Sequence, residues 1–252
     1  MKVVILAAGY AIRLHPMTLN TSKSLLSVGG KKMIDRILDK IAAMKNAASS
    51  ICIVTNDKFY GSFNGWLMTS FHRKKTELLN DGTTANENRL GAVQDLEFAI
   101  KSKKIDDDLL VIAGDNLFDF DLDRFIEFAK GRADGVSVAL HDIKKFESAR
   151  SFGVVEIDVD EKVVDFEEKP EKPKSTLISC GIYYFPKEKL SLIEEYVKQQ
   201  NKLDAPGYYI SWMSKVDRVY GFTFLEDWYD IGNIESYEKA DREYRKKESA
   251  ER

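Results

Sequence analysis

Short apolar runs alternate with amphipathic stretches in the first half of the chain. Residues 2–7 and 51–55 are apolar and rich in β-branched side chains, which is typical of buried strands. Residues 33–45 and 58–72 instead repeat apolar side chains at mostly helical spacing. Strands that alternate with such helices predict an α/β fold with a mostly parallel sheet. The apolar stripe of the second helix is expected in the core: Phe59, Phe63, Trp66, Leu67 and Phe71.

The second half of the chain is richer in strands. From residue 135, three strand-like segments follow one another, GVSVAL, FGVVEID and KVVDFEEKP, with charged turns between them. Two amphipathic helices, over residues 186–200 and 205–215, precede a last strand over residues 219–224. Acidic and basic residues alternate from 238 to 252, which predicts a charged helix that frays and keeps a solvated face.

Composition narrows the classes of function. The net charge is −3 and the two signs are mixed along the chain, which argues against a nucleic-acid partner, because binding a phosphate backbone needs a concentrated basic face. Cys52 and Cys180 lack CxxC spacing and are expected to be buried free thiols. No apolar run approaches membrane-spanning length, and residues 2–7 are too short for a signal-peptide core. We therefore expect a cytoplasmic protein with no membrane partner.

Charged residues follow two of the predicted strands. Gly9 comes directly after the first strand, and Arg13 and Lys23 are the only strong cations in the loop that follows it. A Gly-bearing turn at the carboxyl end of a strand is where an open α/β sheet usually binds an anionic ligand. Asp115 follows a second apolar strand, where a carboxylate can hold a hard divalent cation through oxygen. This pattern predicts a site for a triphosphate and a metal.

The opening segment also carries a resemblance. LAAGYAIRLHPMTLNTSKSLLSVGGKKMID is similar to the signature of the sugar-phosphate nucleotidylyltransferases, roughly LAAGxGTRLxPxTxxxPKxLLPVxGKPMI. Five later segments continue the resemblance in order: GDN at 114–116, FGVVE at 152–156, FEEKP at 166–170, SCGIYYF at 179–185 and WYDIG at 228–232. A lone glycine loop is weak evidence, whereas six ordered segments are specific.

The resemblance implies a fold and a domain organisation. The fold would be a Rossmann-like, three-layer α/β/α nucleotidyltransferase fold of the GT-A type, with a mixed, mostly parallel central sheet. A single domain would cover residues 1–252. Within it we expect a nucleotide-binding half at 1–134, an acceptor-binding half at 135–237 and a charged C-terminal tail at 238–252.

The resemblance also implies a reaction. A Mg²⁺-dependent nucleotidylyltransferase would join a nucleoside triphosphate to a sugar 1-phosphate, giving an NDP-sugar and pyrophosphate. A phosphomonoester has a second pKa of about 6, so the acceptor is already ionised at neutral pH and needs no general base. The sequence leaves the base, the sugar and the oligomeric state open, and an oligomer is possible.

The roles that the resemblance implies fall into three groups. Arg13 would hold the leaving pyrophosphate, Lys23 the charge at the α-phosphate, and Asp115 and Asp230 the Mg²⁺ ion. Lys169 would bind the sugar phosphate. The remaining acceptor contacts would come from Glu168 and from the backbone at Gly153, and the nucleoside contacts from the backbone at Leu6, Ala8, Gly9 and Gly91.

The opening segment departs from the family pattern at several positions: Ser22 and Ser24 flank the lysine, where the pattern has a proline before it, and two further departures precede the arginine. Where the family usually has Gly and Thr before the arginine, this chain has Ala11 and Ile12. Alanine adds a Cβ where the backbone must approach phosphate, and isoleucine cannot donate a hydrogen bond. Either the loop is one phosphate donor short, or Ala11 has a negative φ in a loop shaped around it, with Ile12 packed into the core.

These departures and one unusual loop leave two alternatives. The loop at residues 80–95 is long and polar, and in the resembling family it reads the base. Its asparagines are similar to those of phosphocholine-type cytidylyltransferases, so a cytidylyltransferase acting on a non-sugar phosphomonoester is the first alternative. A non-catalytic nucleotide-sugar sensor, favoured by Ala11 and Ile12, is the second.

Overall fold

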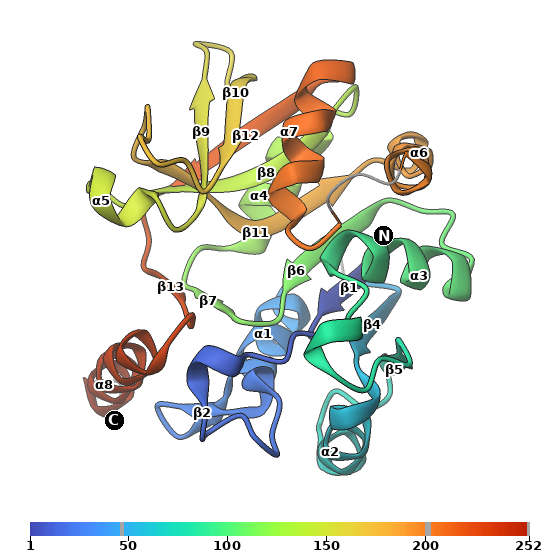
Figure 1. Cartoon of the computed structure of the whole chain (residues 1–252), viewed down its shortest axis with the longest axis vertical. Coiled ribbons are helices and arrows are strands. Elements are labelled where there is room, and N and C mark those ends of the chain that lie inside the picture. Colours follow the sequence, from blue (N-terminus) through green and yellow to red (C-terminus); the bar gives the residue numbers. More distant parts are fainter. Residues whose placement is uncertain (46–47, 200–202, 251–252) are drawn as a thin grey trace.

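The computed structural model of the chain describes residues 1–45, 48–199 and 203–250 (Figure 1). Residue 200 of the predicted helix and residues 251–252 of the predicted tail lie outside these residues. A nine-stranded sheet with the order β10-β9-β11-β6-β1-β4-β5 runs through the molecule, and β8 and β12 branch from it at β11. Among the described helices, none is long and apolar enough to cross a membrane.

Four parallel strands form the first half of the sheet. The chain passes from β1 to β4 and β5 on one side, and then returns to place β6 on the other side of β1. Strand order therefore reverses at β1, which opens a crevice at the carboxyl ends of these strands. The four strands are β1 (Lys2–Leu6), β4 (Ser50–Thr55), β5 (Thr76–Asn80) and β6 (Leu109–Ala113).

The second half of the sheet is mixed. β11 joins it to the first half by pairing antiparallel with β6, and β9 and β10 form an antiparallel hairpin at the far edge (Figure 1). β12 pairs parallel with β8. These strands are β8 (Val136–Asp142), β9 (Gly153–Ile157), β10 (Val163–Glu168), β11 (Leu177–Phe185) and β12 (Val219–Phe224).

Helices cover both faces of the sheet because its central strands are apolar on both sides. On β1, Val3 and Ile5 are buried in the core that contains α1, α2 and α4, whereas Val4 is buried in the core that contains α3, α6 and α7. This gives three layers, as predicted. The helices are α1 (Met33–Ala42), α2 (Asp57–Thr69), α3 (Ala92–Lys103), α4 (Leu122–Lys130), α5 (Phe146–Ala149), α6 (Ser191–Lys198), α7 (Pro206–Val216) and α8 (Ile234–Ala250).

Short elements connect these layers. They are the 3-10 turns η1 (Ile12–Leu14), η2 (Lys23–Leu25), η3 (Asn86–Asn88) and η4 (Lys187–Lys189), the hairpin β2 (Ser27–Val28) with β3 (Lys31–Lys32), and the pair β7 (Asn116–Phe118) with β13 (Trp228–Asp230). The predicted helix over 186–200 is thus divided into η4 and α6.

One residue of the predicted aromatic stripe does not lie in the core. Phe59, Phe63 and Trp66 are buried in the core, and Leu67 packs against it. Phe71 is fully exposed, so its prediction is wrong. The reason is that α2 ends at Thr69, after which Phe71 no longer follows the helical repeat.

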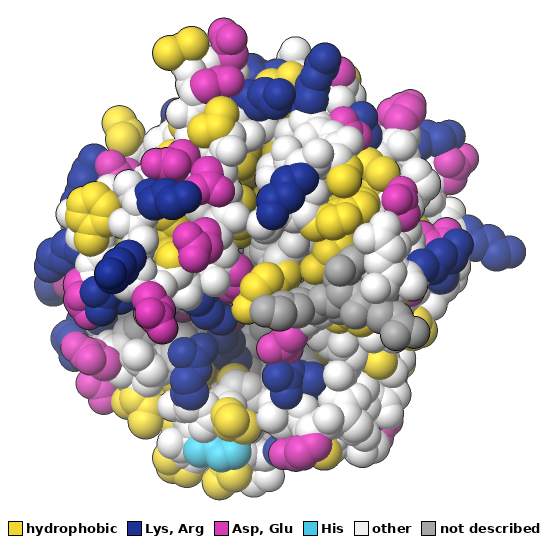
Figure 2. Space-filling model, turned by 45° about the horizontal axis from the view of Figure 1, so that its top comes forward, with side chains coloured by type: hydrophobic (Ala, Val, Ile, Leu, Met, Phe, Trp, Pro, Cys, Tyr) yellow, Lys and Arg dark blue, Asp and Glu magenta, His cyan; other side chains and the backbone are white. Residues whose placement is uncertain are grey.

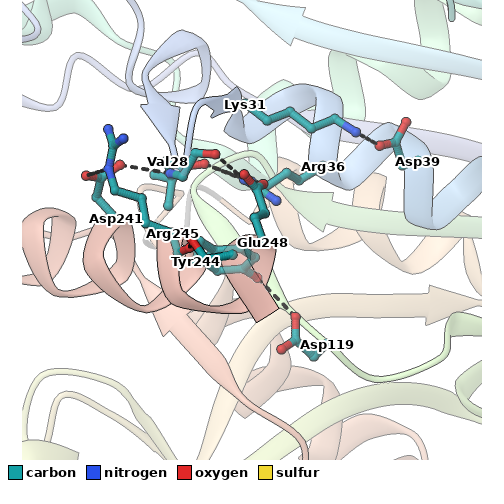
Figure 3. Close-up of polar contacts among 11 residues, drawn as sticks. Val28, Lys31, Arg36, Asp39, Asp119, Asp241, Tyr244, Arg245 and Glu248 are labelled. Carbon is teal, nitrogen blue, oxygen red and sulfur yellow. Dashed lines mark hydrogen bonds and ion pairs between the residues drawn. The ribbon is translucent and has the colours of Figure 1, made fainter. Parts of the chain in front are cut away.

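The C-terminal tail is docked rather than frayed. α8 is continuous over Ile234–Ala250, and its buried residues Ala240 and Tyr244 join a small core with residues of β2, α1 and β7. The Arg36 guanidinium lies 4.4 Å from the centre of the Tyr244 ring, and Tyr244 Oη donates to Asp119 Oδ1 at 3.1 Å (Figure 3). The prediction of a frayed tail is wrong because one short inward face finds partners far away in the sequence.

Polar contacts continue this docking along the helix. Arg36 donates to Val28 O and pairs with Glu248 Oε1 at 2.6 Å, and Gly29 N donates to Asp241 Oδ1 at 2.8 Å.

On the face of the molecule in Figure 2, cationic and anionic side chains are interspersed. This mixing agrees with the net charge of −3.

Candidate active site

The loop after β1 turns sharply at the position where the resembling family has glycine. Ala11 is left-handed, with φ 48° and ψ 45°. Its carbonyl oxygen accepts hydrogen bonds from Thr18 Oγ1 at 2.8 Å and from Leu14 N at 3.0 Å. These bonds hold a conformation that costs an L-residue about 1–2 kcal/mol. The expectation of a negative φ at Ala11 is therefore wrong, since contacts further along the loop fix the turn.

Ile12 lies on the open side of the same turn. Its side chain is 55% exposed and lines a cleft together with Arg13. The buried residue of η1 is Leu14, two positions later. The alternative in which Ile12 packs into the core is thus wrong.

Two aspartates that are far apart in the sequence become neighbours. Asp115 follows β6, and Asp230 ends β13. Because β7 pairs antiparallel with β13, Asp230 lies opposite Asn116, and Ile231 N donates to Asp115 O at 3.3 Å. Asn116 Nδ2 in turn donates to Cys180 O at 2.7 Å. The strand pair therefore carries Asp230 to the carboxyl end of β6.

Three cations act on this pair of aspartates. Lys23 Nζ lies 2.6 Å from Asp115 Oδ2. Burial, followed by the charge of Asp115, raises the pKa of Asp230 to about 6, whereas the charges of Lys23, Arg13 and Lys169 lower it. Electrostatic influence decreases with distance, so the other four residues lie within electrostatic range of Asp230. We call Arg13, Lys23, Asp115, Lys169 and Asp230 the charged centre.

The acceptor-side residues form a compact group at the end of β10. Glu168 is paired with Gly153 in the β9–β10 hairpin, and its side chain is only 8% exposed. A Cβ on Gly207 would lie 1.8 Å from Glu168 Oε2, so α7 approaches this carboxylate closely. Burial raises the pKa of Glu168, and the nearby charge of Lys169 lowers it. Glu168 and Lys169 form an ion pair at 3.6 Å.

A cleft of about 520 Å³ lies over the carboxyl ends of β1 and β6. Lys169 lies on a neighbouring open groove of about 460 Å³ that Arg150 and Lys172 also line. Gly153, Glu168 and Asp230 are not among the lining residues of either hollow. The predicted site residues that line the cleft are Leu6, Ala8, Gly9, Arg13, Lys23, Gly91 and Asp115.

Comparison with known proteins decides the family. Residues 2–247 match the family described as Nucleotidyl transferase. The chain belongs to this family. The bifunctional protein GlmU of Methanocaldococcus jannaschii is 29% identical over 235 residues, which cover 92% of this chain and 51% of that protein. This chain thus spans about half the length of the curated relative that it matches.

A solved structure shares the nucleotidyl transferase fold. It is a Bacillus anthracis protein classed as a glucose-1-phosphate thymidylyltransferase, crystallised with a sucrose. The two structures have a TM-score of 0.79 and 26% sequence identity, and the match covers 97% of this chain and 95% of the other. The fold and the family expected from the sequence are therefore confirmed.

The charged centre of this nucleotidyl transferase offers two carboxylates to a divalent cation. Among the described residues, no group of three or more His, Cys, Asp or Glu side chains could hold a metal ion. Asp115 and Asp230 nevertheless lie close enough for the charge of one to raise the pKa of the other. Mg²⁺ is commonly bound by one or two carboxylates together with substrate phosphates and water. The donor set therefore suits Mg²⁺ held jointly with a triphosphate.

Sequence reasoning missed a second pair of acids, of which Asp95 lines the cleft. Asp95, in the first turn of α3, is only 6% exposed and lines the cleft. Asp81 Oδ1 accepts hydrogen bonds from Thr83 N at 2.7 Å and Thr83 Oγ1 at 2.8 Å. Burial, followed by the charge of Asp81, raises the pKa of Asp95 to about 8. The sequence feature that could have identified Asp95 is its position on the apolar stripe of α3, beside Leu96.

An ion pair joins this wall to the opposite half of the molecule. Arg89 Nε and Nη2 donate to the two carboxylate oxygens of Asp204, at 2.8 and 3.1 Å. Gly91 approaches the same segment, because a Cβ on it would lie 2.6 Å from Leu203 O. Ala92 N donates to Asp204 O at 3.3 Å. The start of α3 is therefore held against the segment that leads into α7.

Proposed function

We propose that this protein is a Mg²⁺-dependent nucleotidylyltransferase that joins a nucleoside triphosphate to a sugar 1-phosphate. The observation that carries this proposal is the charged centre, where Lys23 pairs with Asp115 and the charges of three cations act on Asp230, close to the point at which strand order reverses. Family membership supports the reaction class. The name of the Bacillus anthracis protein, a glucose-1-phosphate thymidylyltransferase, supports a sugar 1-phosphate as acceptor.

The reaction is an in-line displacement at the α-phosphorus. A phosphate oxygen of the acceptor forms a bond to the α-phosphorus, the bond from that phosphorus to the bridging oxygen breaks, and pyrophosphate leaves with its electron pair. No proton needs to be removed from the acceptor, because its phosphate is already ionised. Catalysis then depends on position and on the neutralisation of charge.

Each member of the charged centre has a role in this displacement. Arg13 lines the cleft and would bind the leaving pyrophosphate. Lys23 pairs with Asp115 in the structure, and we expect it to turn to the α-phosphate when the triphosphate enters. Asp115 and Asp230 would hold Mg²⁺, which neutralises phosphate charge when bound. Lys169, from the neighbouring groove, would bind the acceptor phosphate.

Two further groups would complete the substrate contacts. Glu168, beside Lys169, would accept hydrogen bonds from sugar hydroxyls, with Gly153 as its partner across the hairpin. The backbone at Leu6, Ala8, Gly9 and Gly91 would contact the nucleoside along the cleft. The sheet half at residues 1–134 then binds the nucleotide, and the half at 135–237 binds the acceptor.

A pyrophosphate-release screen tests this function. The common triphosphates are combined with a panel of phosphomonoesters that includes sugar 1-phosphates and phosphocholine, with and without Mg²⁺. We expect turnover only with Mg²⁺ and at least one sugar 1-phosphate. Release with phosphocholine alone would favour the cytidylyltransferase alternative. Binding of a nucleotide sugar without turnover in any combination would favour the sensor.

A further inference from the structure

The cleft has two chemically different walls. Arg13, Lys23 and Asp115 line it at the charged centre, whereas Asp95 lines it from the start of α3. The charges that shift the pKa of Asp230 come from the charged centre, and the charge that shifts the pKa of Asp95 comes from Asp81. The cations of the charged centre are not among the charges that shift the pKa of Asp95. If the triphosphate of the proposed substrate lies at the cations, its base lies toward Asp95.

Asp81 and Asp95 are an acid pair, and among the described residues neither forms an ion pair with a cation. Asp81 Oδ1 is occupied by the two hydrogen bonds from Thr83, while Asp81 Oδ2 and Asp95 Oδ1 are buried and have no donor. One proton held between these two oxygens satisfies both, as in other carboxyl pairs that share a site. The raised pKa of Asp95 agrees with a proton retained at neutral pH. Asp95 Oδ2 is then left as the oxygen that meets the cleft.

The neighbouring cation, Arg89, does not compete for Asp95 Oδ2. The Arg89 guanidinium is engaged by both oxygens of Asp204 and also donates to Asn86 O at 2.8 Å. Asp95 therefore presents a hydrogen-bond acceptor with a negative charge close behind it. Cytosine and adenine carry an exocyclic amino donor on their base-pairing edge, whereas uracil, thymine and guanine carry a carbonyl oxygen at the corresponding position.

We propose that Asp95, held by Asp81, selects a nucleobase with an amino group at C4 of a pyrimidine or C6 of a purine, cytosine or adenine, by accepting a hydrogen bond from that group. This inference rests on the proposed function, because it requires a nucleotide in the cleft with its phosphates at the charged centre. A carbonyl base would place one acceptor against another and leave both without a donor. The expected penalty is about tenfold or more in affinity.

The test is the binding of five triphosphates to the full chain. CTP, ATP, GTP, UTP and dTTP are titrated with Mg²⁺ by calorimetry, without an acceptor. We expect CTP or ATP to bind about tenfold or more tightly than UTP and dTTP. Asp95→Ala should reduce this ratio to near one. Asp95→Asn should keep the preference, because its amide nitrogen can donate to Asp81 and its oxygen can face the base.

A matched control is Asp123→Asn. Asp123 is also 6% exposed and also lies in the first turn of a helix, but in α4, away from the cleft. Asp123→Asn should leave unchanged the ratio between the affinities for CTP or ATP and those for UTP or dTTP. Binding of UTP, dTTP or GTP by the wild-type protein that is as tight as, or tighter than, binding of CTP and ATP overturns the inference and leaves the proposed function intact. An amino-base preference that survives Asp95→Ala removes the role of Asp95, and no binding of any triphosphate overturns both proposals.

Discussion

The carboxylates of the charged centre and those at the start of α3 have different partners. At the charged centre, Asp115 is paired with Lys23 at 2.6 Å, and cations lower the pKa of Asp230 against the effect of its burial. At the start of α3, the charge that raises the pKa of Asp95 is that of Asp81, and among the described residues no cation contributes to this shift. Paired carboxylates can exchange partners with phosphate or metal, whereas a like-charged pair traps a proton. The two sites therefore differ in the charge of the groups that lie next to their carboxylates, since both sites contain acids.

Loss of either aspartate at the charged centre should have the largest effect. Asp115→Asn and Asp230→Asn each remove an anionic oxygen ligand, so turnover should fall by orders of magnitude in both variants. Folding should survive, because Asp230 is buried near another negative charge and its replacement removes a repulsion. Pyrophosphate release and thermal unfolding are measured together, with Asp123→Asn as control. Near-normal turnover that resists a chelator in both variants would contradict the metal assignment.

The two lysines of the charged centre should separate donor from acceptor. Lys23→Ala should weaken triphosphate binding, and Lys169→Ala should weaken acceptor binding, each by about 10- to 100-fold, since one charged hydrogen bond contributes about 1.5–3 kcal/mol. Titration of each ligand alone measures this. Lys174→Ala is a control, because Lys174 pairs with Asp165 and lines neither hollow. If Lys169→Ala lost affinity for the triphosphate and kept affinity for the acceptor, the roles assigned to Lys23 and Lys169 would have to be exchanged.

The acid pair should make stability depend on pH. In the unfolded chain Asp95 loses its proton near pH 4, while in the folded protein its pKa is about 8. The stabilisation that the retained proton provides is complete below about pH 4 and is lost as the pH rises through about 8. Asp95→Asn removes this dependence, so its melting temperature should rise relative to wild type between pH 5 and about pH 9. An equal difference at every pH would argue against a shared proton.

The smallest expected effect concerns the turn beside the charged centre. Ala11 is left-handed and Ile12 is exposed, so the double change Ala11→Gly and Ile12→Thr should raise stability by about 1 kcal/mol. For a chain of this size that is about 2–4 °C in melting temperature. Turnover should change only several-fold, because one neutral hydrogen bond contributes about 1 kcal/mol. Ala85→Gly, at φ −147°, is the control and should lower stability. A lower melting temperature in the double variant would contradict the strain at Ala11.

Local patterns predicted most elements of the fold. The buried run that became β1 and the inward stripe of α1 are visible because apolar spacing along the chain determines which face is buried. The same reasoning failed at Phe71, because the apolar pattern continues beyond the end of α2 at Thr69. It also failed for α8, whose anchor Tyr244 is one aromatic residue among many charges.

Sequence by itself determined the strand and helix types, the family resemblance and the candidate members of the charged centre. The tertiary structure alone decided that Asp230 comes beside Asp115, that Asp95 meets Asp81, and that Ala11 is left-handed. These facts depend on strand pairing and on contacts between residues far apart in the chain. The physical reason is that propensity and spacing act over a few residues, whereas the charge state of a buried acid is set by whatever the fold places against it.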